Sequence, residues 1–167
     1  MPISWLLSEP QIFIIWILAI LVTLTIHEFL HAFSAFLLGD STAKSEGRMT
    51  LNPISHIDPL GFVMLLFVGF GWARPVPINP YNLKNQRLGT AIVSLAGPFA
   101  NLVGVIGFGL AFKFLSPTLG PANLLVNFLF LLTLVNASLF IFNLLPIPPL
   151  DGSKVFLAAI PDKFVSF

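Results

Sequence analysis

Long apolar stretches alternate with short polar turns along this chain. Apolar runs extend over residues 11–38, 88–115 and 122–145, and a shorter run covers 60–72. At about 1.5 Å per residue, the first run is a helix roughly 42 Å long, which exceeds the about 30 Å hydrocarbon core of a bilayer. The other two long runs are also long enough to cross. The pattern therefore predicts an α-helical membrane protein with about three transmembrane helices.

The stretch between the first two of these helices has a different pattern. The run LGFVMLLFVGFGW at 60–72 is too short to cross a bilayer as a helix, which favours a re-entrant or half-membrane segment. The ARPVPINP sequence that follows favours an extended backbone because its prolines alternate. It is either a rigid connecting turn or an edge that pairs with another extended chain. Residues 40–59 are polar, and AKSEGRMTL is a weak strand pattern. A short extended or β region is therefore expected here.

Composition supports a membrane-embedded chain. Of its 167 residues, 56% are hydrophobic and only 9% are charged, where a soluble domain carries about 25% charged residues. The net charge of +1 indicates no attraction to nucleic acid, and the absence of cysteine excludes disulfides and thiolate metal ligands. The opening residues lack a basic stretch and a cleavage site, so we expect the first helix to be retained. We expect one domain over 1–167, with a tail at 146–167.

Three ionisable residues interrupt the first apolar run. His27, Glu28 and His31 form a His-Glu-x-x-His motif in its second half. Positions i and i+4 share one helix face, so both imidazoles can reach one metal ion, and Glu28 can hold a water that the metal has acidified. A single histidine in an apolar helix is usually a satisfied core residue. Ionisable groups within a membrane helix are nevertheless costly, so the motif predicts a metal site with hydrolytic chemistry.

Other polar residues in or near the apolar runs are candidates for the same site. Asp151 follows the third run and is the best candidate for a third metal ligand, although an aspartate before glycine is also common in turns. Asn136 and Asn143 are seven residues apart, so they share a face that we expect to point into the bundle. Asn101 is either a packing residue or a neighbour of the site. His56 is either a loop histidine or a polar group near the metal.

The distribution of basic residues predicts the orientation. Three crossings place the first ten residues and the 116–121 turn on one side, and residues 39–87 and the tail on the other. The second side carries seven of the eight basic residues, namely Lys44, Arg48, Arg74, Lys84, Arg87, Lys154 and Lys163, and the first side carries Lys113. The positive-inside rule makes the second side cytoplasmic. The histidines and Asp151 then approach the same side, which supports a shared site there.

Five sequence motifs resemble one family. HEFLH, LNPISHIDPLG, GWARPVPINP, SLAGPFAN and FNLLPIPPLDG occur together, in family order, over roughly residues 15–160. In this respect the chain resembles the site-2 protease family of intramembrane zinc metalloproteases. The segment after LDG is shorter than in many members, and no PDZ or CBS domain is present. The resemblance therefore implies a membrane-embedded metalloprotease core, as a compact member or as part of a longer one.

The resemblance also implies roles for individual residues. Zinc would be bound by three ligands, namely His27, His31 and Asp151. Glu28 would be the catalytic base, and Asn143 would contact substrate or the oxyanion of the intermediate. His56 and Asn101 match family positions near the active site. The implied partners are a transmembrane protein or peptide as substrate and the lipid bilayer, with the active site toward the cytoplasmic side of the cell membrane.

Three other classes of function compete with this interpretation. A metal transporter also uses intramembrane histidines and carboxylates, but it usually distributes ligands over several helices along a continuous polar path. An inactive binding protein commonly lacks a ligand or the base, and here all are present. A purely structural subunit leaves the buried ionisable groups without a role. The sequence therefore favours a zinc metalloendopeptidase.

Overall fold

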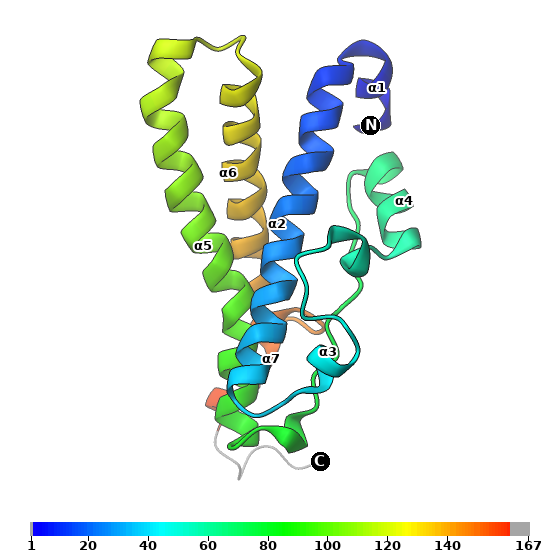
Figure 1. The fold of residues 1–167 in the computed structure, drawn as a ribbon, viewed down its shortest axis with the longest axis vertical. Coiled ribbons are helices and arrows are strands. Elements are labelled where there is room, and N and C mark those ends of the chain that lie inside the picture. Colours follow the sequence, from blue (N-terminus) through cyan, green and yellow to red (C-terminus); the bar gives the residue numbers. More distant parts are fainter. Residues whose placement is uncertain (1, 161–167) are drawn as a thin grey trace.

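Three long helices form the body of the protein. The computed structural model describes residues 2–160 (Figure 1). Helices α2 (Pro10–Leu37), α5 (Gln86–Leu119) and α6 (Leu124–Asn143) each pack against the other two. The shorter elements are η1 (Pro2–Ser4), α1 (Trp5–Ser8), α3 (Thr42–Ser45), η2 (Pro53–His56), α4 (Pro59–Val68), η3 (Pro80–Asn82) and α7 (Asp151–Ala159).

The surface of this bundle suits a membrane. All three long helices are long and apolar enough to span a bilayer, and most of their apolar side chains face outward. A soluble bundle would bury such a face against another element, whereas lipid tails can cover it. The predicted three-helix pattern is confirmed, and the chain is an integral membrane protein.

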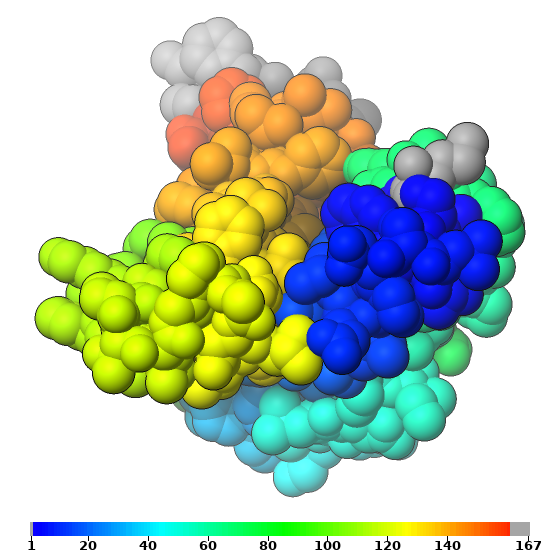
Figure 2. Space-filling model, turned by 90° about the horizontal axis from the view of Figure 1, so that it is seen from above, coloured from blue at the N-terminus to red at the C-terminus, as the bar shows by residue number. Residues whose placement is uncertain are grey.

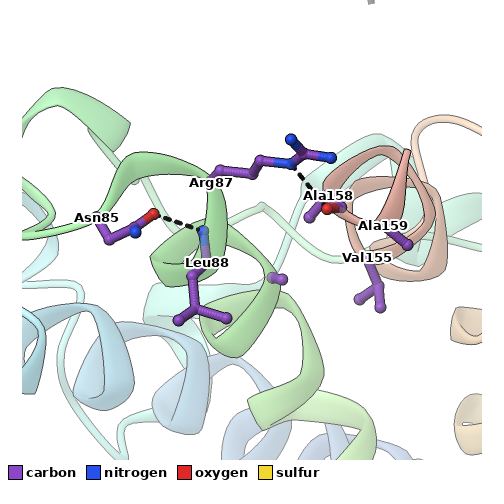
Figure 3. A pocket seen from close by; sticks show the side chains of 7 residues that line it. Asn85, Arg87, Leu88, Val155, Ala158 and Ala159 are labelled. Carbon is purple, nitrogen blue, oxygen red and sulfur yellow. Dashed lines mark hydrogen bonds between the residues drawn. The ribbon is translucent and has the colours of Figure 1, made fainter. Parts of the chain in front are cut away.

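Local signals explain where the long helices begin. Pro10 occupies the first turn of α2, where its missing N–H costs no helical hydrogen bond. The Asn85 side chain accepts a hydrogen bond from the backbone N–H of Leu88 at the start of α5 (2.9 Å; Figure 3). Asn123 does the same for Leu125 at the start of α6 (2.9 Å). Each side chain satisfies a backbone donor that the first helical turn leaves without a partner.

The connections alternate between the two ends of the bundle. The N-terminal segment and the turn between α5 and α6 form one end, which Figure 2 shows from above. The polar segment after α2, η3 and α7 lie toward the opposite end (Figure 1). This alternation agrees with the predicted order of three crossings.

The segment between α2 and α5 contains helices and extended backbone. Helix α4 has 10 residues, which confirms that the apolar run at 60–72 is too short to cross. Gly69, with φ +83°, ends it, and the chain turns back so closely that a Cβ at Gly61 would lie 3.0 Å from the Trp72 nitrogen. An isolated antiparallel bridge joins Ile57 to Ala73.

Of the expected extended or β region, the β alternative is wrong within residues 2–160, which contain no strand beyond that bridge. The start of the AKSEGRMTL sequence is helical, because α3 covers Thr42–Ser45. The 73–79 segment is extended but cannot continue a ladder, since Pro75 and Pro77 have no N–H to donate. Of the predicted tail, α7 is a helix, and residues 161–167 lie outside the described residues.

The buried carboxylate of Asp40 attaches the extended segment to the end of α2. Asp40 is fully buried and accepts hydrogen bonds from the Asn79 N–H (2.7 Å), the Asn82 amide (2.9 Å), and the Thr42 N–H (3.0 Å) and hydroxyl. Burial raises the pKa of Asp40, but the hydrogen bonds from Thr42, Asn82 and Asn79 outweigh it and hold the pKa below its usual value. Asp40 therefore fixes where residues 74–79 run beside α2.

Replacing Asp40 by alanine should lower the free energy of unfolding by about 2 kcal/mol or more, because several buried donors lose a charged acceptor. The folded-state pKa lies below the unfolded value, so the stabilisation is present above about pH 4 and declines as pH falls through the folded pKa. Thermal unfolding in detergent at pH 7 and pH 3 measures both effects. The matched control, Glu46→Ala at an exposed position of the same segment, should change stability by less than about 0.5 kcal/mol. An equal loss at both pH values in Asp40→Ala would contradict this role of the carboxylate.

Candidate metal centre

Helix α2 presents two buried imidazoles on one face. His27 and His31 are 4% and 5% exposed, and their ring centroids lie 4.6 Å apart. Asp151, the first residue of α7, brings a carboxylate to the same place. Its Oδ2 atom lies 3.3 Å from His27 Nε2 and 3.1 Å from His31 Nε2, and the two Nε2 atoms lie 3.0 Å apart. Three potential ligand atoms therefore form a nearly equilateral triangle.

The outer ring nitrogens of both histidines are hydrogen bonded. His31 Nδ1 lies 2.7 Å from the backbone carbonyl of Val93, which can only accept, so this nitrogen carries the proton. His27 Nδ1 lies 2.6 Å from the Asn101 side-chain oxygen and donates to it. In the neutral rings both Nε2 atoms then carry lone pairs, which point toward each other and toward the carboxylate. A metal ion between them, or a proton on one of the Nε2 atoms, relieves this repulsion.

The residues present fit a zinc ion. Tetrahedral zinc with ligands at about 2.0–2.1 Å has neighbouring ligand atoms about 3.3–3.4 Å apart, close to the observed triangle. Two nitrogens and one carboxylate oxygen leave one position for water or substrate, as in catalytic zinc sites. Hydrogen bonds to the outer ring nitrogens are typical of zinc-binding histidines. Among residues 2–160 this is the one such group of potential ligands.

Contacts of α7 with the other helices position Asp151. A Cβ at Gly152 would lie 2.6 Å from the Leu145 carbonyl oxygen, so glycine is required where α7 passes the end of α6. At the far end of α7, Arg87 Nε of α5 donates to the Ala158 carbonyl (2.7 Å; Figure 3). A pocket of about 340 Å³ lies beside this contact. In the Asp-Gly sequence, the aspartate is therefore the potential ligand, and the glycine provides the space that lets α7 bring this carboxylate close to the histidines.

The electrostatics of the site favour an ionised Asp151. Burial raises the pKa of the carboxyl, but interaction with His27 and His31, when these carry protons, outweighs it and holds the pKa below its usual range. Its other oxygen lies 3.9 Å from the Lys154 ammonium, and the first turn of α7 also favours a negative charge. The aspartate is thus available as an anionic ligand.

Glu28 lies next to the triangle and contacts the extended segment. Its Oε2 accepts a hydrogen bond from the Val76 N–H (3.2 Å). Arg48, buried beneath this segment, donates to the Arg74 carbonyl (2.7 Å), and the Arg74 N–H donates to the His56 carbonyl (2.9 Å). The extended segment is thus held on both sides and in turn orients the Glu28 carboxylate.

The remaining predicted site residues differ in where they lie. Asn101 contacts His27 directly, as one of its two interpretations required. Asn143, at the end of α6, donates to the carbonyl of Leu139 in its own helix (3.1 Å) rather than to a residue of the triangle. His56 is 2% exposed and donates from Nε2 to the Thr50 carbonyl (2.9 Å). Its Nδ1 has no hydrogen-bond partner among the described residues.

Sequence reasoning missed three contributors to the site. Thr23 and the Val93 carbonyl lie among its buried polar groups, and Gly97 provides the space for both imidazoles. Thr23 lies four residues before His27 on the same helix face, a spacing that was available as a signal. The Val93 contribution comes from a backbone carbonyl, so the side chain at this position gives no indication of it in the sequence.

Comparison with known proteins identifies the family. Residues 118–166 match the model of Peptidase family M50. The chain is 43% identical over 152 residues to "Putative zinc metalloprotease YwhC" of Bacillus subtilis, which covers 87% of this chain and 68% of that protein. It is 36% identical over 154 residues to "Putative zinc metalloprotease Rip2" of Mycolicibacterium smegmatis (87% and 57% covered), and 34% identical over 163 residues to Rip2 of Mycobacterium tuberculosis (90% and 61%).

These relationships confirm the family that the motifs indicate. The chain belongs to peptidase family M50, the site-2 protease family of zinc metalloproteases. It spans about two thirds of the length of the Bacillus relative and somewhat less of the two mycobacterial ones. No solved structure matches the chain.

Substituting Gly97 by alanine should abolish metal binding, since the new Cβ would lie 2.6 Å from His27 Nε2 and closer still to His31 Nε2. Zinc content per purified protein, determined by mass spectrometry, measures this. Gly107→Ala, in the same helix with nothing within 4 Å of its Cβ, is the matched control and should retain zinc. Full zinc content in Gly97→Ala would show that the triangle is not the metal site.

Proposed function

We propose that this chain is an intramembrane zinc metalloendopeptidase that hydrolyses peptide bonds of membrane-spanning substrates. The observation that carries the proposal is the convergence of His27, His31 and Asp151 within 3.3 Å of one another, next to Glu28, inside a bundle of apolar helices. Family membership supports zinc and proteolysis, and the apolar helices support a substrate that lies in the bilayer.

The proposed chemistry assigns separate tasks to the metal and to Glu28. His27, His31 and Asp151 would hold the zinc ion, which would supply an acidified water molecule and polarise the peptide carbonyl. Glu28 accepts the proton of that water and later returns it to the leaving nitrogen, as a general base and then a general acid. The Val76 N–H holds one oxygen of Glu28, which leaves the other free to take the proton.

A membrane-spanning substrate must expose its peptide bond before it can react. Helical substrates hide their peptide groups, so the substrate unwinds locally and lies against the extended 73–79 segment. Three donors of this segment are already used, because the N–H groups of Arg74, Val76 and Asn79 bond within the protein. Pro75 and Pro77 have no donors. A substrate strand therefore pairs chiefly with the carbonyl oxygens of this segment.

Two further residues have proposed roles near the substrate. The Asn143 amide, at the end of α6, donates a hydrogen bond to the oxyanion of the intermediate after it leaves the Leu139 carbonyl. His56 supports the extended segment from below through the Arg74 N–H. Both roles extend the ones that the family motifs imply.

The proposed location is the cell membrane, with the active site toward the cytoplasm. Basic residues cluster at the end of the bundle that holds the segment after α2 and the start of α5. The positive-inside rule assigns that end to the cytoplasm. His27, His31 and Asp151 lie nearer to it than to the N-terminal end, which gives water its shortest route to the site.

Glu28→Gln should keep zinc and lose cleavage of a single-span membrane peptide by about 100-fold or more, since it removes a general base without removing a ligand. Asp151→Ala should lose most of the zinc. Cleavage by purified protein and zinc content are measured side by side, with Glu46→Gln as a matched control that should behave like the unaltered chain.

Each outcome distinguishes a class of function. Cleavage by the unaltered chain but not by Glu28→Gln, at equal zinc, supports the protease. Zinc bound without cleavage of any substrate in a panel, together with zinc flux into vesicles, would instead favour metal transport. Full zinc and activity in Asp151→Ala would overturn the ligand assignment.

A further inference from the structure

A chain of buried amides leads from His27 away from the metal centre. The Asn101 amide nitrogen of α5 donates to the Asn136 side-chain oxygen of α6 (3.1 Å). The Asn136 amide nitrogen donates to the Leu132 carbonyl (2.7 Å) and to the Thr23 hydroxyl oxygen of α2 (3.0 Å). With the bond from His27 to Asn101, these residues connect all three long helices.

This network lies entirely within the bundle. Thr23, Asn101, Asn136 and His27 are 1%, 1%, 4% and 4% exposed. Water cannot compensate for a broken hydrogen bond at such a site, so an unpaired amide there is strongly destabilising in a membrane. Each amide is therefore held to one orientation.

The direction of every bond follows from a single acceptor. The Leu132 carbonyl cannot donate, so Asn136 must turn its nitrogen toward it and its oxygen toward Asn101. Asn101 must then donate to that oxygen, which turns its own oxygen toward His27. His27 must consequently carry its proton on Nδ1, which leaves the Nε2 lone pair for a metal. If His27 carried its proton on Nε2 instead, the amides of Asn101 and Asn136 would both have to turn round. The Asn136 side-chain oxygen would then face the Leu132 carbonyl oxygen.

The two histidines thus reach the same state by different routes. The Val93 carbonyl determines the tautomer of His31 in one step. Within residues 2–160, His27 Nδ1 is instead hydrogen bonded to the Asn101 side chain, an amide that can donate or accept. Asn101 alone therefore leaves the tautomer of His27 undetermined, and a further group must fix it.

We propose that Asn136, held by the Leu132 carbonyl and the Thr23 hydroxyl, is a positioning residue that acts through Asn101 to fix the metal-binding tautomer of His27. This inference rests on the proposed zinc site. Space for the amide comes from Gly104 of α5, since a Cβ there would lie 2.7 Å from the Asn136 side-chain carbon. A residue that touches neither metal nor substrate thereby controls the first ligand of the motif.

The test measures zinc affinity of the purified full chain by competition with a chelator. Asn136→Leu should weaken zinc binding by about 10- to 100-fold, the usual cost of losing a hydrogen-bonding partner behind a metal ligand. Asn127→Leu, the same substitution on the same helix, is the matched control. The Asn127 amide bonds to the Pro121 and Asn123 carbonyls, and its loss should leave zinc affinity unchanged.

A rescue experiment separates a relay from a general structural role. In Asn101→Asp the new carboxylate only accepts, so it fixes the proton on His27 Nδ1 without help from Asn136. Asn101→Asp combined with Asn136→Leu should therefore bind zinc more tightly than Asn136→Leu alone. Independent, additive losses would overturn the proposal, because a packing defect at Asn136 would persist in either background.

A second variant covers the case in which Asn136→Leu does not fold. Gly104→Ala keeps every polar group but displaces the Asn136 amide, and it should weaken zinc binding and be rescued by Asn101→Asp. Gly107→Ala is its control. Tight zinc binding in Gly104→Ala would overturn the relay while leaving the protease intact. Absence of zinc from the unaltered chain, or zinc that persists in His27→Ala, would overturn both proposals.

Discussion

The structure depends on the requirement that polar groups inside an apolar bundle have partners. His27, His31 and Asp151 direct only lone pairs at one another when the rings are neutral, so a metal ion or a proton between them would stabilise this part of the bundle. Asn101 and the Val93 carbonyl are the hydrogen-bond partners of the outer ring nitrogens of His27 and His31 in this arrangement. Metal binding at this group would relieve a repulsion that folding itself creates.

The same requirement connects the Glu28 carboxylate to the rest of the chain. Glu28 faces Val76, whose segment is attached at its far end by Asp40 and supported by Arg48. The prolines of this segment have no backbone N–H to donate, so the segment does not join a sheet. An irregular backbone persists at such a site because the N–H groups of Arg74, Val76 and Asn79 have fixed partners, which gives the Glu28 carboxylate a rigid neighbour.

Much of the fold and half of the site could be predicted from the chain. Three apolar runs identify three helices to within about four residues at each end. His27, Glu28 and His31 share a helix face by their spacing, and Asp151 follows from the side to which the third helix returns. Of the extended or β region expected between the first two helices, the β alternative is not found within residues 2–160, because weak alternation is outweighed by turn residues and by prolines that cannot donate.

The sequence by itself determined the periodic and local features, since apolar runs and i, i+4 spacing depend only on helix geometry and on the cost of charge in lipid. Only the tertiary structure decided which long-range partners complete the site. The Val93 carbonyl, the space at Gly97 and the link from Asn101 to Asn136 join residues between 35 and 74 positions apart. Such contacts depend on how α2, α5 and α6 pack, and no periodic pattern within one helix records that packing.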